Sequence, residues 1–110
     1  MATYINTPIV VEFIHVADGA LDFTPTRTLR VFDARGRVVT AAAVATSFQI
    51  SNVGNAITAS ETLGNNVPDL VGRASVVDDA NYLVAVGGTL RSTLVGAGTT
   101  ARTYVYCYTT

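Results

Sequence analysis

Short runs of β-branched and aromatic residues, separated by turn-forming residues, recur along the whole chain. Valine, threonine and tyrosine dominate these runs, and clusters of glycine, asparagine and aspartate divide them. Such runs favour strands over helices, and the segments between them are too short for the helical crossovers that parallel strands require. We therefore expect an all-β fold of roughly seven or eight short strands, an antiparallel β-sandwich with the jelly roll as a candidate form.

Length and composition set further limits. A chain of 110 residues has the usual size of one domain, so we expect a single β-sandwich domain over residues 1–110. Hydrophobic residues make up 49% of the chain and charged residues only 14%, which suggests that part of the surface meets a partner. A strand protein rich in alanine, valine and threonine has the same composition without a partner, and both interpretations stay open.

The charged residues argue against a nucleic-acid partner. The formal net charge is −1, too low for a broad basic surface that gathers phosphates. All seven basic residues are arginine, whose rigid and bidentate contacts suit protein interfaces. Biased codon usage in a GC-rich genome explains the same bias, and composition does not separate the two explanations.

Several strands are predicted in the first half of the chain. The nearly continuous apolar run 9–16 predicts a strand covered on both faces, ended by a turn at Asp18 and Gly19. Residues 28–33 and 37–40 predict a β-hairpin with its turn at 34–36. Residues 41–45 fit a loop, a strand or one helical turn. In residues 47–53 polar and apolar residues alternate, which predicts a strand with Phe48 and Ile50 on one face. A turn at Gly54 and Asn55 is expected to end this strand.

The second half begins with a polar stretch, 61–69, which predicts a long surface loop. Strands are expected at 71–77, 81–86 and 89–95, with a turn at Gly87 and Gly88; in the last of these strands Leu90 and Leu94 face opposite to Arg91 and Thr93. The last strand, 102–108, has two different faces. Val105 and Cys107 lie on one face, and Tyr104, Tyr106 and Tyr108 lie on the other.

Residues suited to catalysis or metal binding are few. The only histidine, His15, lies in the most apolar run, so we expect a packed or interfacial residue and no enzyme. One histidine and one cysteine, Cys107, cannot supply a zinc site, and Cys107 is expected to be a small buried hydrophobe. Asp78, Asp79 and Asn81 form the densest oxygen cluster, but a turn explains it better than a cation site. We predict no metal and no cofactor.

The sequence also bears on location. Residues 1–7 lack the basic start and apolar run of a signal peptide, and no stretch approaches the roughly 20 apolar residues of a membrane span. We therefore expect a protein made and used without its own export signal and without a membrane partner.

The three tyrosines of the last strand form the strongest candidate contact surface. Tyrosine offers a large, rigid contact area with a polar tip, and it is enriched in interfaces. The opposite face of the strand already supplies the small apolar residues that a core needs. Alternatively, the tyrosines simply cover one half of the sandwich. We predict an interface made by Tyr104, Tyr106, Tyr108, Arg91 and Arg102.

Four segments of the C-terminal half resemble a known family: Asn55-Ala56-Ile57-Thr58, Arg73-Ala74-Ser75-Val76-Val77-Asp78-Asp79-Ala80-Asn81-Tyr82, Ala85-Val86-Gly87-Gly88-Thr89-Leu90-Arg91 and Tyr104-Val105-Tyr106. Over residues 50–108 the chain is similar to small β-rich proteins encoded beside the major capsid protein in tailed-phage genomes, the capsid decoration or cement proteins. The N-terminal half departs from that pattern. The resemblance implies a protein made in the host cytoplasm that binds the major capsid protein on the outer capsid surface of the virion, commonly as a homotrimer, and stabilises the head.

Two other functions compete with this one. The first is a receptor- or carbohydrate-binding β-sandwich module of a phage fibre that uses residues 61–69 as its contact surface. The absence of tryptophan weakens carbohydrate binding, because sugar-binding sites favour that platform. The second is a small hydrolase, for which the sequence offers no catalytic residue set; turnover that depends on Asp78 or Asp79 would favour it.

Overall fold

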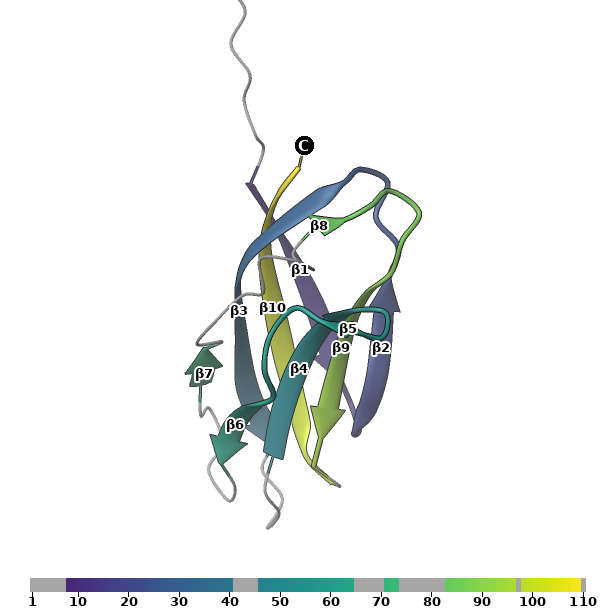
Figure 1. Ribbon diagram of the computed structural model, residues 1–110. Coiled ribbons are helices and arrows are strands. Elements are labelled where there is room, and N and C mark those ends of the chain that lie inside the picture. Colours follow the sequence, from purple (N-terminus) through teal and green to yellow (C-terminus); the bar gives the residue numbers. More distant parts are fainter. Residues whose placement is uncertain (1–7, 41–45, 65–70, 74–82, 97, 110) are drawn as a thin grey trace, which may run out of the picture.

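The computed structural model describes residues 8–40, 46–64, 71–73, 83–96 and 98–109 (Figure 1). Every regular element within these ranges is a β-strand, and the described part contains no helix. The strands are β1 (Pro8–His15), β2 (Gly19–Phe23), β3 (Leu29–Thr40), β4 (Thr46–Asn52), β5 (Asn55–Ala56), β6 (Glu61–Gly64), β7 (Val71–Arg73), β8 (Leu83–Val84), β9 (Leu90–Val95) and β10 (Thr100–Thr109). The all-β expectation is confirmed.

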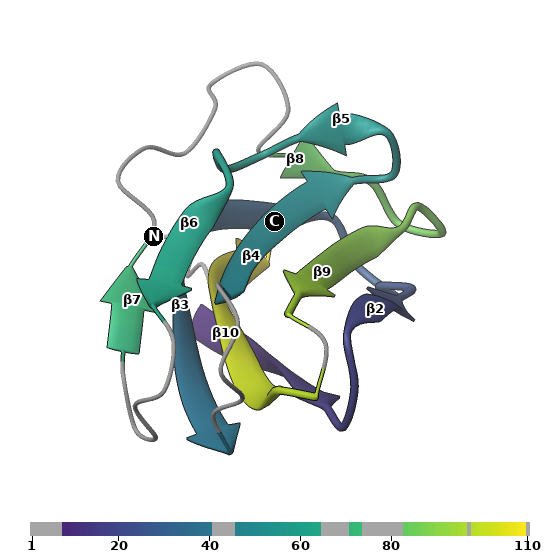
Figure 2. The same cartoon turned by 90° about the horizontal axis from the view of Figure 1, so that it is seen from below.

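The strands form two antiparallel sheets that pack face to face, as Figures 1 and 2 show. The first sheet has the order β1-β10-β3, with β7 and β8 both paired to the far edge of β3. The second has the order β2-β9-β4, with β5 and β6 both paired to the far edge of β4. The predicted antiparallel β-sandwich is confirmed.

The strand order identifies the type of sandwich. When β5 and β6 are taken as one position, and β7 and β8 as another, the first four positions pair with the last four in reverse order, as in one long hairpin. This hairpin is rolled up so that β10 also meets β3 and β9 also meets β4. An antiparallel hairpin rolled in this way is a jelly roll.

The core lies between the two sheets and is built by alternate residues of each strand. Strand β1 contributes Val11 and Phe13, and β4 contributes the fully buried Phe48 and Ile50. The prediction that β1 is covered on both faces is wrong, since Val10 and Ile14 are 54% and 53% exposed. Their parity directs them to the outer face of the sheet, where no further layer of described residues covers them.

Strand β3 differs from the sequence-based expectation. It runs unbroken through residues 34–36, so the predicted hairpin is wrong. Gly36 lies in the middle of the strand, where a Cβ atom would come within 2.8 Å of the Phe48 ring. The glycine therefore allows the ring to pack against the β3 backbone, and it does not mark a turn.

A bulge interrupts the pairing of β3 with β10. The register shifts between Tyr106 and Cys107, and the consecutive residues Asp33 and Ala34 of β3 are both buried. Such a bulge inserts one extra residue on one strand and changes which side chains face outward. As a result Phe32 and Arg35 both lie on the outer face of this sheet.

The expected turns and loops have mixed outcomes. The turn after β4 is confirmed, and the Gly87–Gly88 turn is closed by a hydrogen bond of 2.8 Å from the Gly88 N–H to the Ala85 carbonyl. The predicted loop at 61–69 is wrong in its first part, because Glu61–Gly64 is strand β6.

Strands β7 and β8 lie within the expected runs 71–77 and 81–86. Residues 41–45, 65–70 and 74–82, including Asp78, Asp79 and Asn81, lie outside the described residues.

The two-residue turn between β4 and β5 contains a strained valine. Val53 has a φ of 53°, a left-handed conformation that costs an L-residue with a Cβ about 1–2 kcal/mol. We expect Val53→Asn to stabilise the protein by about 1 kcal/mol, because asparagine tolerates this left-handed conformation far better than a β-branched residue does. Urea denaturation measures the change. An unchanged or lower midpoint would show that Val53 is not strained.

Candidate functional site

The outer face of the sheet β1-β10-β3 holds the predicted contact residues. Strand β10 lies between β1 and β3, so its outward side chains occupy the middle of this face. Tyr104, Tyr106 and Tyr108 point outward, while Val105 and Cys107 are fully buried. The predicted division of the last strand into a core face and an outer face is confirmed.

An aromatic cluster covers the part of this face near the C-terminal end of β10. The ring of Phe32 stacks on Tyr108 with their centroids 4.7 Å apart, and it lies 6.4 Å from Tyr106 at a tilted angle. The Arg35 guanidinium lies 5.7 Å from the Tyr106 ring centroid, a cation–π contact. Phe32 nevertheless stays 46% exposed. An exposed aromatic cluster beside an arginine has the composition of an interface core.

We call this surface the aromatic–arginine face and define it by eight residues: Arg30, Phe32, Arg35, Arg37, Arg102, Tyr104, Tyr106 and Tyr108. Sequence reasoning found the tyrosines and Arg102 but missed the residues of β3. The opposite parity of Val31 and Phe32 was a signal for an outward Phe32. That these side chains lie beside the tyrosines depends on the pairing of β3 with β10, some 70 residues apart in sequence.

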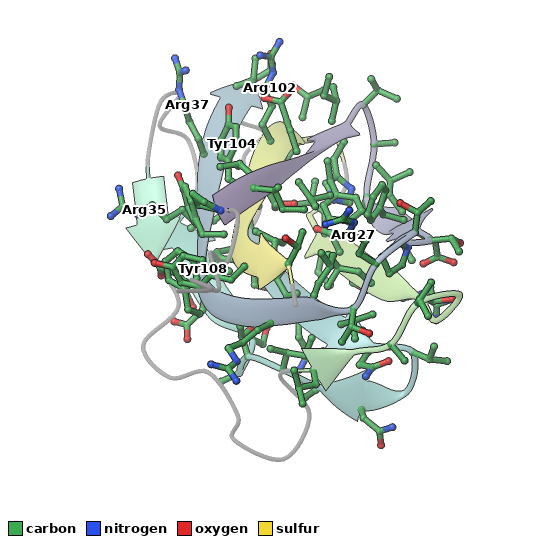
Figure 3. All side chains as sticks on the ribbon, turned by 90° about the horizontal axis from the view of Figure 1, so that it is seen from above. Arg27, Arg35, Arg37, Arg102, Tyr104 and Tyr108 are labelled. Atoms are coloured by element: carbon green, nitrogen blue, oxygen red, sulfur yellow. The ribbon has the colours of Figure 1, made fainter. Side chains whose placement is uncertain are left out.

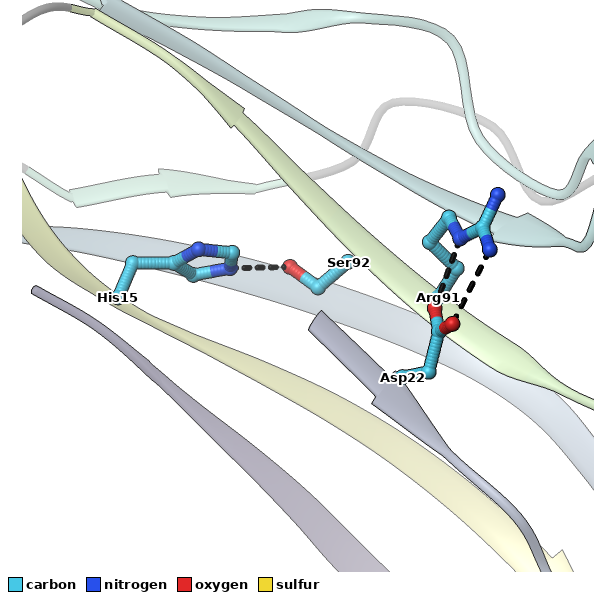
Figure 4. A network of polar contacts seen from close by, with 4 residues as sticks. All are labelled: His15, Asp22, Arg91 and Ser92. Atoms are coloured by element: carbon cyan, nitrogen blue, oxygen red, sulfur yellow. Dashed lines mark hydrogen bonds and ion pairs between the residues drawn. The ribbon is translucent and has the colours of Figure 1, made fainter. Parts of the chain in front are cut away.

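The two arginines predicted for the interface lie on different sheets. Arg102 belongs to the aromatic–arginine face, where Figure 3 shows it near Tyr104. Arg91 lies on the outer face of the second sheet and forms a bidentate pair with Asp22, at 2.7 and 3.0 Å (Figure 4). The hydrogen bonds from Arg91 lower the pKa of Asp22, and the Asp22 carboxylate raises the pKa of Arg91. The structure therefore brings Arg102, and not Arg91, together with the tyrosines.

His15 forms a buried polar link between the sheets. Its Nε2 lies 2.9 Å from the Ser92 Oγ, which in turn lies 2.6 Å from the Thr103 Oγ1 (Figure 4 shows the first contact). Burial lowers the pKa of His15, because the charged imidazolium would lose its hydration. Although this pair has the distance of a nucleophile and its base, Ser92 is fully buried, so no substrate reaches its hydroxyl. The packed position predicted for His15 is confirmed.

Of the other residues considered for chemistry, Cys107 packs in the core, and Asp78, Asp79 and Asn81 lie outside the described ranges. Cys107 is fully buried, and desolvation raises its pKa to about 12, so the thiol stays protonated and packs as a small hydrophobe, as expected. Among the residues that the structure describes, no three His, Cys, Asp or Glu side chains gather as a metal site would require. The described residues also include no helix of the length and apolarity needed to cross a membrane.

Comparison with known proteins identifies a solved structure with a similar fold. No protein-family model matches the chain, and no curated protein matches it in sequence. The fold is similar to that of a chain in the "Acidic stable capsid structure of Helicobacter pylori bacteriophage KHP30", with a TM-score of 0.56 and 15% sequence identity. The match covers 97% of this chain and 90% of that chain. At this identity the likeness establishes a shared fold over nearly the full length of both chains.

Proposed function

We propose that this chain is a structural virion protein that decorates and stabilises a phage capsid from its outer surface, bound to the lattice of the major capsid protein. The observation that carries the proposal is the match to a chain of a phage capsid, which covers nearly all of both chains. A small jelly roll of about this size thus occurs within a phage capsid. Jelly rolls are common in viral capsids generally, which agrees with this role.

The aromatic–arginine face supports the proposal because its composition suits a contact surface. Tyrosine and arginine are the residues that most often dominate binding energy at interfaces. Here three tyrosines, Phe32 and the arginines lie on the outer face of one sheet, with Val10 and Ile14 beside them on β1. Many copies of such a modest contact across a capsid would add up through multivalency to resist internal pressure.

Self-association, as a homotrimer, is part of the same proposal. Within the described residues β1 pairs only with β10 and β2 only with β9, so both strands leave an edge open. Leu21 and Phe23 have the core-facing parity of β2 and yet are each 38% exposed at this edge. Proteins commonly cover open strand edges and apolar residues of this kind by association between copies.

The test combines a mass measurement with particle binding. We expect light scattering after size exclusion to give a trimer, and we expect this trimer to co-sediment with undecorated heads of the phage that encodes it. The variant with Tyr104, Tyr106 and Tyr108 all changed to alanine should bind heads at least about tenfold more weakly while keeping its circular dichroism spectrum. Val95→Ala, an exposed change on the second sheet, serves as the control.

Two results would contradict the proposal. A wild-type protein that ignores heads is not a decoration protein, and a triple variant that binds as well as wild type does not use this face. A monomer that ignores heads but binds on a glycan array would instead support the receptor- or carbohydrate-binding module, since lectins also use jelly rolls.

A further inference from the structure

Acidic and basic residues are unevenly distributed over this chain. The outer face of the sheet β1-β10-β3 carries four arginines and two acids: Arg30, Arg35, Arg37, Arg102, Glu12 and Asp33. The rest of the sequence carries three arginines and six acids. A face with a formal charge of +2 therefore belongs to a chain with a net charge of −1. Net charge alone conceals this separation.

The positive charge gathers at one end of the aromatic–arginine face. Arg102 of β10 stands directly opposite Arg37 of β3, and Arg35 stands opposite Tyr104 in the adjacent row. Figure 3 shows the side chains of Arg37 and Arg102 on the same side of the molecule as Tyr104. Like charges directly opposite each other destabilise a sheet.

Among the described residues, the guanidinium groups of Arg35 and Arg102 have only long-distance carboxylate partners. The Arg102 Nη1 lies 3.9 Å from the Glu12 carboxylate, and the Arg35 Nε lies 3.7 Å from the Asp33 carboxylate. Both distances exceed the roughly 2.7–2.9 Å of a charge-assisted hydrogen bond, whereas Arg91 reaches 2.7 Å to Asp22. The two side chains are 47% and 45% exposed, so their donors are available to another molecule.

The surrounding aromatic rings indicate which kind of anion fits. Single-stranded nucleic acids bind by stacking bases on free aromatic faces. Here Arg35 lies over one face of the Tyr106 ring, and Phe32 stacks on one face of the Tyr108 ring, so fewer ring faces are left for bases to stack on. The planar arginine fork, by contrast, matches a carboxylate in two parallel hydrogen bonds. The arrangement favours acidic side chains of a protein.

We propose that the basic end of the aromatic–arginine face, formed by Arg35, Arg37, Arg102 and Tyr104, docks onto a carboxylate-rich patch of a partner protein. This inference rests on the proposed function, and it names the chemistry of the capsid surface that this chain recognises. Electrostatic attraction speeds and orients such docking, and the arginine forks provide the directed contacts.

The first experiment compares two charge reversals in binding to undecorated heads. Arg102→Glu changes the basic end, while Arg27→Glu makes the same charge change at an exposed residue between β2 and β3, apart from Arg37 and Arg102 in Figure 3. We expect Arg102→Glu to weaken binding at least about tenfold and to flatten its dependence on salt, and Arg27→Glu to stay within about twofold of wild type. Equal weakening by both variants would overturn the inference.

The second experiment tests the chemistry without heads, so that failure of the proposed function and failure of this inference are distinguishable. Wild-type protein is titrated with a decaglutamate peptide and, separately, with a ten-nucleotide oligothymidylate, while NMR follows the arginine Nε–H and Tyr104 signals. We expect decaglutamate to shift the signals of Arg35, Arg37 and Arg102 in wild type and in Arg27→Glu, but far less in Arg102→Glu. Shifts from decaglutamate without head binding would disprove the decoration role alone. Tighter binding of oligothymidylate at these residues, or no shift with either probe, would overturn the inference.

Discussion

Replacing Gly36 by alanine should destabilise the protein by about 1–3 kcal/mol, the cost of forcing extra atoms into a packed core. The added Cβ would lie 2.8 and 2.9 Å from two carbons of the Phe48 ring and 3.2 Å from a methyl group of Leu63. Phe48 is fully buried, so its ring cannot move aside without displacing the neighbouring core residues. Thermal and urea denaturation would measure the loss, which corresponds to about 4 °C or more per kcal/mol.

Gly54→Ala supplies the matched control for this substitution. A Cβ at Gly54 would meet no atom within 4 Å, and this glycine has no positive φ, so the change should leave stability within about 0.5 kcal/mol of wild type. Combining Gly36→Ala with Phe48→Leu should cost less than the two single changes added together, because the smaller side chain makes room for the methyl group. Strict additivity, or a stable Gly36→Ala protein, would refute this account of β3.

Removing the Ser92 hydroxyl should lower the free energy of unfolding by about 1–3 kcal/mol, because two buried polar groups lose the hydrogen-bond partner that they share. Ser92 links His15 Nε2, at 2.9 Å, to Thr103 Oγ1, at 2.6 Å, between the two sheets. Ser92→Ala preserves the volume of the side chain closely, so the loss reports mainly on the hydrogen bonds. Urea denaturation at pH 8 measures it. Thr93→Ala, on the outward face of the same strand, should be near neutral.

The same histidine should make stability depend on pH. Burial lowers the pKa of His15 in the folded protein, so the unfolded chain binds more protons as the pH falls below the ordinary value of about 6.5. The contribution of His15 to the free energy of unfolding is therefore fully present above that value, and it is lost as the pH falls toward the pKa of the folded protein. His15 is the only histidine in the chain, and carboxylates titrate mainly at lower pH. Equal stability at pH 7.5 and 5.5 would contradict the assignment.

Local patterns in the sequence predict the strands and their inner and outer faces well. Alternation alone places Phe48 and Ile50 in the core and divides Tyr106 from Cys107 correctly, because successive residues of a strand point to opposite sides. The sequence pattern wrongly predicts a turn at Gly36. The position needs a glycine because the Phe48 ring of the other sheet packs against its backbone. Nothing in the residues near Gly36 reveals that contact.

The composition of the candidate site depends on pairing between distant strands. Tyr104 and Arg102 are neighbours in sequence, but Arg35 and Arg37 join them only because β3 pairs with β10. Arg91 and Arg102 are close in sequence, and yet the chain passes from one sheet to the other between β9 and β10. Strand order and register therefore decide which arginines share a surface, and local sequence patterns do not encode them.

The central positions of β9 and β10 affect how the chain is made. Strand β10 is the described strand that joins β1 to β3, and β9 is the one that joins β2 to β4, although both come last in the sequence. During synthesis the first four strands leave the ribosome before the partners that connect them exist. Such long-range pairing slows folding and leaves strand edges exposed in the meantime. The nascent chain is consequently most prone to aggregation until residues 90–109 have emerged.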